Sequence, residues 1–174
     1  ALPTYTATPE MSPGIGSVFV SDDFSDESAW DTASSNQGSA AISRNRLTLA
    51  AEPGVYLLSM NREAVLGDFY AEITARPSLC RGEDSYGIII RSTGKSFYSF
   101  TLTCNSTISA ERYQSSIRLL MQPPTPSGDA PPGAPGEVRI GMWAVGSEMR
   151  FFLNDRFQFS INDPSSPIGS FGVF

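Results

Sequence analysis

The chain has 174 residues, of which 12 are basic and 18 acidic, so its formal net charge is −6 at pH 7, and it contains no histidine. An acidic protein lacks the basic face that binding to nucleic acid requires. With two cysteines as the remaining soft ligands, a zinc or copper site is not expected. The length and a hydrophobic content of 40% fit one domain with its own core, and no run of apolar residues predicts a membrane span.

Residues 1–16 are rich in Pro, Thr, Ala and Gly and show no hydrophobic periodicity. This composition predicts a flexible arm or linker, although a terminus without any role has the same composition. We expect the folded domain to span residues 17–174. The chain begins at Ala1 without a basic, apolar leader, so a prediction of export rests on the arm and on the cysteines.

The domain opens with an acidic stretch, VSDDFSDESAWD, which holds five acids and no base and includes Trp30. Aspartates commonly cap turns, so a solvated loop that leads Trp30 onto the core is the simple interpretation. The alternative is a metal site. Without histidine the metal would be a hard cation such as calcium, which takes about six to eight oxygen ligands, and the spacing does not match an EF-hand loop.

Short strands separated by turns follow. Residues 46–50 and 68–76 alternate in polarity, which predicts strands with one buried face. Residues 86–92 form a continuous apolar run, typical of a strand buried on both faces, and a turn at Gly94 joins this run to 96–104 as a hairpin. Further strands are predicted at 116–122, 137–145, 148–154 and 156–162, with Asn, Asp and Gly at the tight turns between the last three.

No window predicts an amphipathic helix of ten or more residues. The pattern therefore predicts an all-β fold of about a dozen strands, arranged as a two-sheet antiparallel jelly-roll sandwich. Residues 122–136 interrupt it with six prolines and three glycines. Because proline cannot donate to a sheet ladder, we expect a long, exposed and disordered rim loop there instead of a strand.

Cys80 and Cys104 each stand at the end of a predicted strand. A disulfide between them would fit an exported protein, and two buried thiols would fit a cytosolic one. We favour the disulfide, and with it an extracellular or cell-surface location.

Several segments resemble, in order, the concanavalin A-like lectin/glucanase superfamily: SDDFSDESAW, NRLTLAA, GDFYAEITAR, YGIIIRSTGKSFYSFTL, MRFFLNDRFQF and PIGSFGVF. The variant they resemble is the laminin-G-like bacterial surface form related to 3-keto-disaccharide hydrolase-like domains, over residues 18–174. This resemblance implies a jelly roll of two curved sheets, in a superfamily where many members bind carbohydrate and some hydrolyse glycans. It also implies a structural calcium held by Asp22 or Asp23 together with Asp163.

The sequence departs from the superfamily in two places. No strand carries the Glu-x-Asp-x-(x)-Glu spacing of the glycan-hydrolysing glucanases. Asp68 and Glu72 share a strand face, but about 3.3 Å per residue separates them by about 13 Å, which is too far for the carboxylate pair of a glycosidase. The superfamily also closes with one more strand after the GSFGVF segment, so we expect an open C-terminal edge that can pair with another domain or chain.

Aromatic side chains on a curved sheet can stack on sugar rings, and arginine can bind hydroxyl groups with its forked donors. The candidate ligand-binding residues are Tyr98, Tyr113 and Tyr86, together with Arg91. Arg91 has a structural alternative as the partner of Asp68 or Glu72, because a buried arginine demands a carboxylate. Trp143 lies in the apolar segment IGMWAV and is assigned to the core.

The leading hypothesis is a non-catalytic, lectin-like carbohydrate-binding or adhesion module of an exported bacterial protein. Two alternatives stay open. One is a glycoside hydrolase-like enzyme that acts on a disaccharide or glycan. The other is a protein–protein assembly or structural module that uses the C-terminal edge or the N-terminal arm.

Overall fold

The computed structural model describes residue 11 and residues 14–174. These residues form a short 3₁₀ turn, η1, and strands β1 to β13. The bounds are η1 Glu27–Ala29, β1 Ala33–Ser35, β2 Gly38–Ile42, β3 Leu47–Ala51, β4 Ser59–Leu66, β5 Phe69–Ala75, β6 Ser85–Ser92, β7 Ser96–Thr103, β8 Thr107–Gln114, β9 Ile117–Pro126, β10 Val138–Val145, β11 Glu148–Leu153, β12 Arg156–Asn162 and β13 Gly169–Val173. The described residues include no helix that is long and apolar enough to cross a membrane.

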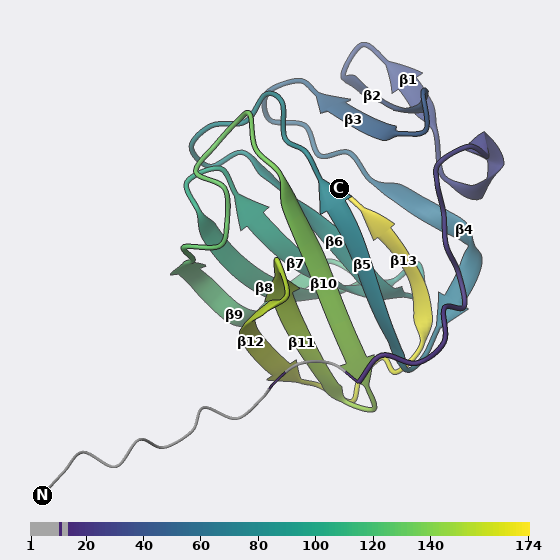
Figure 1. Cartoon of the computed structure of the whole chain (residues 1–174), viewed down its shortest axis with the longest axis vertical. Coiled ribbons are helices and arrows are strands. Elements are labelled where there is room, and N and C mark those ends of the chain that lie inside the picture. Colours follow the sequence, from purple (N-terminus) through teal and green to yellow (C-terminus); the bar gives the residue numbers. More distant parts are fainter. Residues whose placement is uncertain (1–10, 12–13) are drawn as a thin grey trace, which may run out of the picture.

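The strands form two large antiparallel sheets and one small sheet. The four-stranded sheet has the order β12-β11-β10-β5, and the six-stranded sheet has the order β4-β13-β6-β7-β8-β9. Figure 1 shows the four-stranded sheet in front of the six-stranded one, with the small sheet of β1, β2 and β3 at the upper right. The all-β, antiparallel two-sheet sandwich that the sequence predicts is confirmed.

The main core lies between the two large sheets. It is built from the alternate side chains of each strand that point inward, as the period of two in a strand requires. Tyr98, Phe100 and Leu102 of β7 face Met149, Phe151 and other side chains of the four-stranded sheet. Phe100 stacks on Phe151, with 5.6 Å between the ring centroids. The same alternation leaves the odd-numbered residues of β7 on the outer face of the six-stranded sheet.

Trp30 fills a second, smaller core. It is 2% exposed and packs edge-on against Phe171 of β13, with 5.7 Å between ring centroids. Asp22 holds it there, because its carboxylate accepts a hydrogen bond from the indole N–H at 2.6 Å and another from the backbone N–H of Phe24 at 2.7 Å. The acidic stretch therefore opens the domain and seats Trp30 on the core, as its simple interpretation predicts.

The predicted open C-terminal edge is wrong. β13 pairs with β4 on one side and with β6 on the other, so the last strand lies inside the six-stranded sheet. The two end strands of that sheet are β4 and β9, and those of the four-stranded sheet are β12 and β5. The sequence does not reveal this arrangement, because the final strand inserts between two strands, β4 and β6, that lie far before it in the chain.

The predicted rim loop at 122–136 is wrong in its first part, because β9 continues through Pro126. This strand tolerates its prolines because it lies at the edge of the sheet, where one side of the backbone has no ladder to complete. Ser127 and Ala130 in the following segment are buried. The Ser127 hydroxyl hydrogen bonds to Gln158 of β12 at 2.6 Å, which ties this segment to the edge of the other sheet.

Cys80 and Cys104 form the predicted disulfide, with their Cα atoms 5.7 Å apart. The bond closes a segment of 24 residues that contains all of β6 and β7. The β6–β7 hairpin also matches the prediction, because Gly94 at the turn has a φ of 81°, a backbone conformation that glycine adopts without strain.

Candidate functional site

A groove of about 230 Å³ lies on the outer face of the six-stranded sheet. It is lined by Tyr56, Leu58, Ile89, Phe97, Ser99, Tyr113 and Phe174. Phe97 and Ser99 lie in the groove because of strand alternation. They occupy the β7 positions that point away from the core. Their partners across the ladder are Tyr113 and Glu111 of β8, which share that face.

Two stacked aromatic pairs lie in the groove lining. Phe97 and Tyr113 are directly opposite each other on β7 and β8, and their ring centroids are 4.7 Å apart with planes inclined by 15°. Tyr56 and Phe174 form the second pair, with 5.2 Å between centroids and an inclination of 18°. Tyr56 is 64% exposed, so one member of the second pair presents much of its ring to solvent.

Gly87 allows Phe174 to reach the groove. The backbone of Phe174 forms two hydrogen bonds with that of Gly87, at 3.1 and 3.2 Å. A Cβ at position 87 would lie 2.0 Å from the carbonyl oxygen of Phe100 and 3.0 Å from the ring of Phe174. Only glycine fits there, because a side chain would push β7 and the ring away together.

Glu111 supplies the polar part of this face. Its side chain is only 9% exposed, and it forms an ion pair with Arg118 of β9, whose own side chain is 65% exposed. The hydroxyl of Tyr113 donates a hydrogen bond to the Glu111 carboxylate at 2.9 Å. Burial, followed by this bond to a carboxylate, raises the pKa of Tyr113 to about 12. The hydrogen bond to Glu111 fixes the hydroxyl end of the Tyr113 ring over the sheet.

The structure brings one of the predicted ligand-binding residues, Tyr113, into this groove. Tyr98 instead lies in the main core with no exposed surface, and Arg91 is 1% exposed. Tyr86 packs against the same core, and burial raises its pKa to about 12. These three predictions are corrected. The register of β6 and β7 turns Tyr86 and Tyr98 toward the core, whereas Arg91 has a φ of 53°, outside the strand range, so strand alternation does not place its side chain.

Arg91 lacks the carboxylate partner expected of it. Its Nη2 group lies 3.4 Å from the carbonyl oxygen of Gly67, and Nε and Nη1 have no hydrogen-bond partner among the described residues. Burial lowers its pKa. Asp68 instead accepts a hydrogen bond from the backbone of Gly146 at 2.8 Å, and Glu72 faces Tyr70 on the other sheet at 3.2 Å.

Trp143 is not a core residue, which corrects its assignment. It lies on the outer face of the four-stranded sheet, opposite Tyr70 and Arg150 in the two neighbouring strands. The guanidinium carbon of Arg150 is 4.3 Å from the centre of the Trp143 ring, a cation–π arrangement. The residues that face inward on this strand are the neighbouring Met142 and Ala144.

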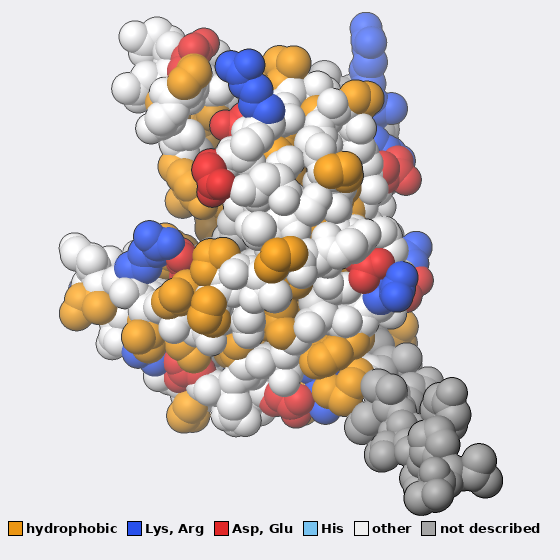
Figure 2. Space-filling model, turned by 90° about the vertical axis from the view of Figure 1, so that its left-hand side faces the viewer, with side chains coloured by type: hydrophobic (Ala, Val, Ile, Leu, Met, Phe, Trp, Pro, Cys, Tyr) orange, Lys and Arg blue, Asp and Glu red, His pale blue; other side chains and the backbone are white. Residues whose placement is uncertain are grey.

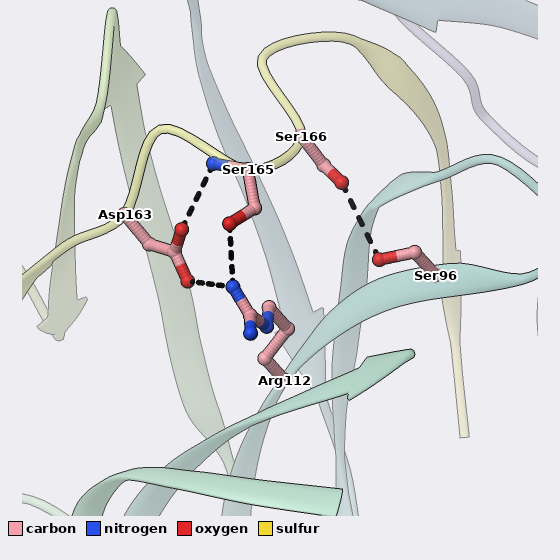
Figure 3. A network of polar contacts seen from close by, with 5 residues as sticks. All are labelled: Ser96, Arg112, Asp163, Ser165 and Ser166. Atoms are coloured by element: carbon pink, nitrogen blue, oxygen red, sulfur yellow. Dashed lines mark hydrogen bonds and ion pairs between the residues drawn. The ribbon is translucent and has the colours of Figure 1, made fainter. Parts of the chain in front are cut away.

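The acids proposed for calcium do not come together. Asp163 accepts hydrogen bonds from Arg112 at 2.7 Å and from the backbone of Ser165 at 2.8 Å, as Figure 3 shows. Asp22 is bonded to Trp30, and Asp23 caps the backbone of Ser25. In the described part of the chain, no three acidic or cysteine side chains form a group that could hold a metal ion, so the calcium prediction has no support from the geometry.

Sequence reasoning missed most of the groove. The residues it did not single out as ligand contacts are Tyr56, Leu58, Ile89, Phe97, Ser99 and Phe174. The sequence did contain a signal for Phe97. Tyr98 and Phe100 share one face of their strand, and two aromatic rings on one face indicate the core side, so Phe97 belongs to the opposite, outer face. No local signal places Tyr56 beside Phe174, since they are far apart in the chain.

No known protein-family model matches the chain, and a sequence search of characterised proteins finds no match. Solved structures do match. The carbohydrate-binding module CBM66 from Bacillus subtilis has a TM-score of 0.68 at 16% identity, over 83% of this chain and 86% of that one. SCLam, a non-specific endo-β-1,3(4)-glucanase of family GH16, has a TM-score of 0.62 at 11% identity, over 95% and 82%.

Sheep galectin-11 in complex with glycerol matches with a TM-score of 0.50 at 11% identity, over 63% of this chain and 87% of that one. These identities establish the fold alone. The fold is a concanavalin A-like jelly-roll sandwich, a fold that carbohydrate-binding modules, galectins and glycoside hydrolases share.

Proposed function

We propose that the chain is a non-catalytic carbohydrate-binding module that holds a sugar in the groove on the outer face of its six-stranded sheet. The observation that carries the proposal is the pair of aromatic stacks, Phe97 with Tyr113 and Tyr56 with Phe174, which lie on a single face. An aromatic ring offers a flat apolar surface to the C–H face of a sugar. Ser99, Glu111 and Arg118 offer polar groups for its hydroxyls.

The charges near the groove favour binding over hydrolysis. Among the described residues, the charged groups that act on the pKa of Tyr56 and Tyr113 are one carboxylate, Glu111, and one base, Arg118. Glycoside hydrolysis uses two carboxylates across the scissile bond. Glu72 and Glu148 lie on the other sheet, where Glu72 faces Tyr70 and Glu148 pairs with Arg150, so they cannot complete a pair with Glu111.

The net charge adds a preference among ligands. Glu111 and Arg118 balance each other at the groove, while the whole chain carries a formal charge of −6. An acidic protein repels polyanions at low ionic strength. Neutral glycans are therefore the proposed ligands, in preference to uronate-containing or sulfated ones. The disulfide and the absence of a free cysteine among the described residues support an exported location for such a module.

The test is binding to a panel of neutral polysaccharides and oligosaccharides, β-1,3- and β-1,4-glucans included, with isothermal titration of each hit. Tyr113→Ala and Phe97→Ala should each weaken binding about tenfold, because one aromatic contact contributes about 1 to 1.5 kcal/mol. Tyr70→Ala is the matched control, since Tyr70 is a half-buried tyrosine on the outer face of the other sheet.

Two results would contradict the proposal. One is the absence of binding to every neutral glycan of the panel. The other is a hit whose affinity falls as much in Tyr70→Ala as in Tyr113→Ala. Release of reducing sugar from a bound glycan would show that the chain is an enzyme and not a non-catalytic module.

A further inference from the structure

The segment that leads to Asp22 is an exposed apolar arm, defined here as residues 14–21. Every residue of the arm is exposed and none belongs to a helix, strand or turn. Ile15, Val18, Phe19 and Val20 are exposed by 67, 81, 86 and 47%. Four large apolar side chains in eight uncharged residues form a strong β-strand sequence, and water is a poor environment for them.

The free edge of β9 has matching properties. β9 ends the six-stranded sheet and pairs only with β8 among the described strands. Its first six residues, 117–122, contain no proline, whereas Pro123, Pro124 and Pro126 lack the N–H that a new partner would need. Ile117, Leu119 and Leu120 are exposed by 71, 45 and 48%. Figure 2 shows the side of the molecule that carries β9 and β12, with hydrophobic side chains gathered in its lower half.

The arm cannot reach this edge within its own chain. It is anchored by Asp22, which is bonded to Trp30, and Trp30 bridges Asn61 of β4. β4 and β9 are the two ends of the six-stranded sheet and lie on opposite sides of the sandwich in Figure 1. Five strand spacings of about 4.8 Å separate them by about 24 Å. Residue 20 is two residues from the anchor and residue 15 is seven, which gives reaches of about 7 and 23 Å, so the segment 15–20 cannot lie along β9 of its own chain.

We propose that residues 15–20 of one copy add as a strand to residues 117–122 of a second copy, so that the chain assembles head to tail. Both segments are six residues long, about 20 Å when extended. Strand addition completes the backbone hydrogen bonds of an open edge and covers the apolar side chains of both partners.

Charge complementarity selects the antiparallel orientation. With residue 20 opposite residue 117, the acidic stretch that follows the arm falls beyond the start of β9. That position lies at the Ser115 turn, whose backbone N–H is bonded to the carbonyl of Lys95 at 2.6 Å. Asp23 of one copy then lies at the turn that holds Lys95 of the next copy. The parallel orientation would place the acids beside the prolines instead.

The assembly is open-ended. The anchor of the arm and the receiving edge lie at opposite ends of one sheet, so the two contacting surfaces differ and the contact is heterologous. Each added copy leaves one free arm and one free edge. The expected species are therefore dimers, trimers and longer chains whose population grows with concentration, and not a closed dimer.

Sedimentation equilibrium without any glycan tests the proposal independently of carbohydrate binding. From micromolar to millimolar protein, the weight-average mass should rise about twofold or more, because each copy can add another. Val18→Asp with Phe19→Asp disables the arm, and Ile117→Asp with Leu120→Asp disables the edge. Each double variant alone should stay monomeric. Leu79→Asp with Val65→Asp removes two other exposed apolar residues, 94 and 65% exposed, and should assemble like the unmodified chain.

Mixing gives the sharpest result. The arm variant keeps its edge and the edge variant keeps its arm, so an equimolar mixture should form heterodimers and stop at two chains. The proposal is overturned if the unmodified chain is monomeric throughout the range, if either double variant assembles as the control does, or if the mixture stays monomeric or grows beyond dimers.

Discussion

Asp163 illustrates how a single carboxylate secures a loop at the end of the sandwich. It follows β12 directly, and its side chain is 7% exposed. Burial acts to raise its pKa, but the hydrogen bonds from Ser165 and the Arg112 guanidinium together outweigh burial and hold the pKa below the ordinary value of 3.8. Ser166 of the same loop bonds to Ser96 of β7, with 3.3 Å between the hydroxyl oxygens, so the loop is attached to two strands of the six-stranded sheet (Figure 3).

This geometry predicts an acid-dependent loss of stability. The pKa of Asp163 is lower in the folded than in the unfolded chain, so its contribution is fully present above about pH 4 and is lost as the pH falls through the lower, folded-state pKa. Asp163→Asn should lower the free energy of unfolding at pH 7 by about 2 kcal/mol and flatten its pH dependence below pH 4. Urea titrations between pH 2.5 and 7 measure both effects.

The control is Asp155→Asn. Asp155 also pairs with an arginine, Arg139, but its side chain is 65% exposed, and such pairs contribute about 0 to 1 kcal/mol. If Asp163→Asn keeps the same pH slope as the unmodified protein, the network around Asp163 does not stabilise the loop as described.

At the scale of elements, the strands could be predicted from their period-two alternation. The order of the strands within each sheet could not. The β6–β7 hairpin was predictable because an apolar run, a glycine turn and a second β-rich run are adjacent. The insertion of β13 between β4 and β6 was not, because its partners are distant in the chain. The groove shares this origin, since Phe174 reaches Tyr56 only through its pairing with Gly87. The local sequence pattern predicts which residues of a strand share a face. Which of the two faces is buried depends on long-range strand pairing, which the local pattern does not contain.

The disulfide element gives a second stability prediction. The bond between Cys80 and Cys104 closes a 24-residue separation around β6 and β7, and a loop of this length restricts the unfolded chain by about 3 kcal/mol. Cys80→Ser with Cys104→Ser should therefore unfold at lower urea, with a loss of about 3 kcal/mol. A thiol assay on the unmodified, urea-unfolded protein should find no free cysteine. Two free thiols per chain would contradict the pairing.

At the scale of the whole molecule, the sandwich presents two different outer faces. The six-stranded sheet carries the groove between the aromatic pairs, and the four-stranded sheet carries Trp143 beneath Arg150. The edges differ as well, because the N-terminal arm is anchored beside β4 through Asp22 and Trp30 while β9 is open at the other end. Ligand binding on one face and head-to-tail assembly along the edges can therefore occur together, which would present many weak sites in a row.

An NMR titration of the ¹⁵N-labelled chain with a neutral oligosaccharide that it binds tests the position of the sugar-binding site most directly. We expect amide shifts concentrated at Tyr56, Phe97, Ser99 and Tyr113, with the amides around Tyr70 and Trp143 unchanged. Shifts confined to the face of Tyr70 and Trp143, or spread evenly over both faces, would contradict the assignment of the groove as the sugar-binding site.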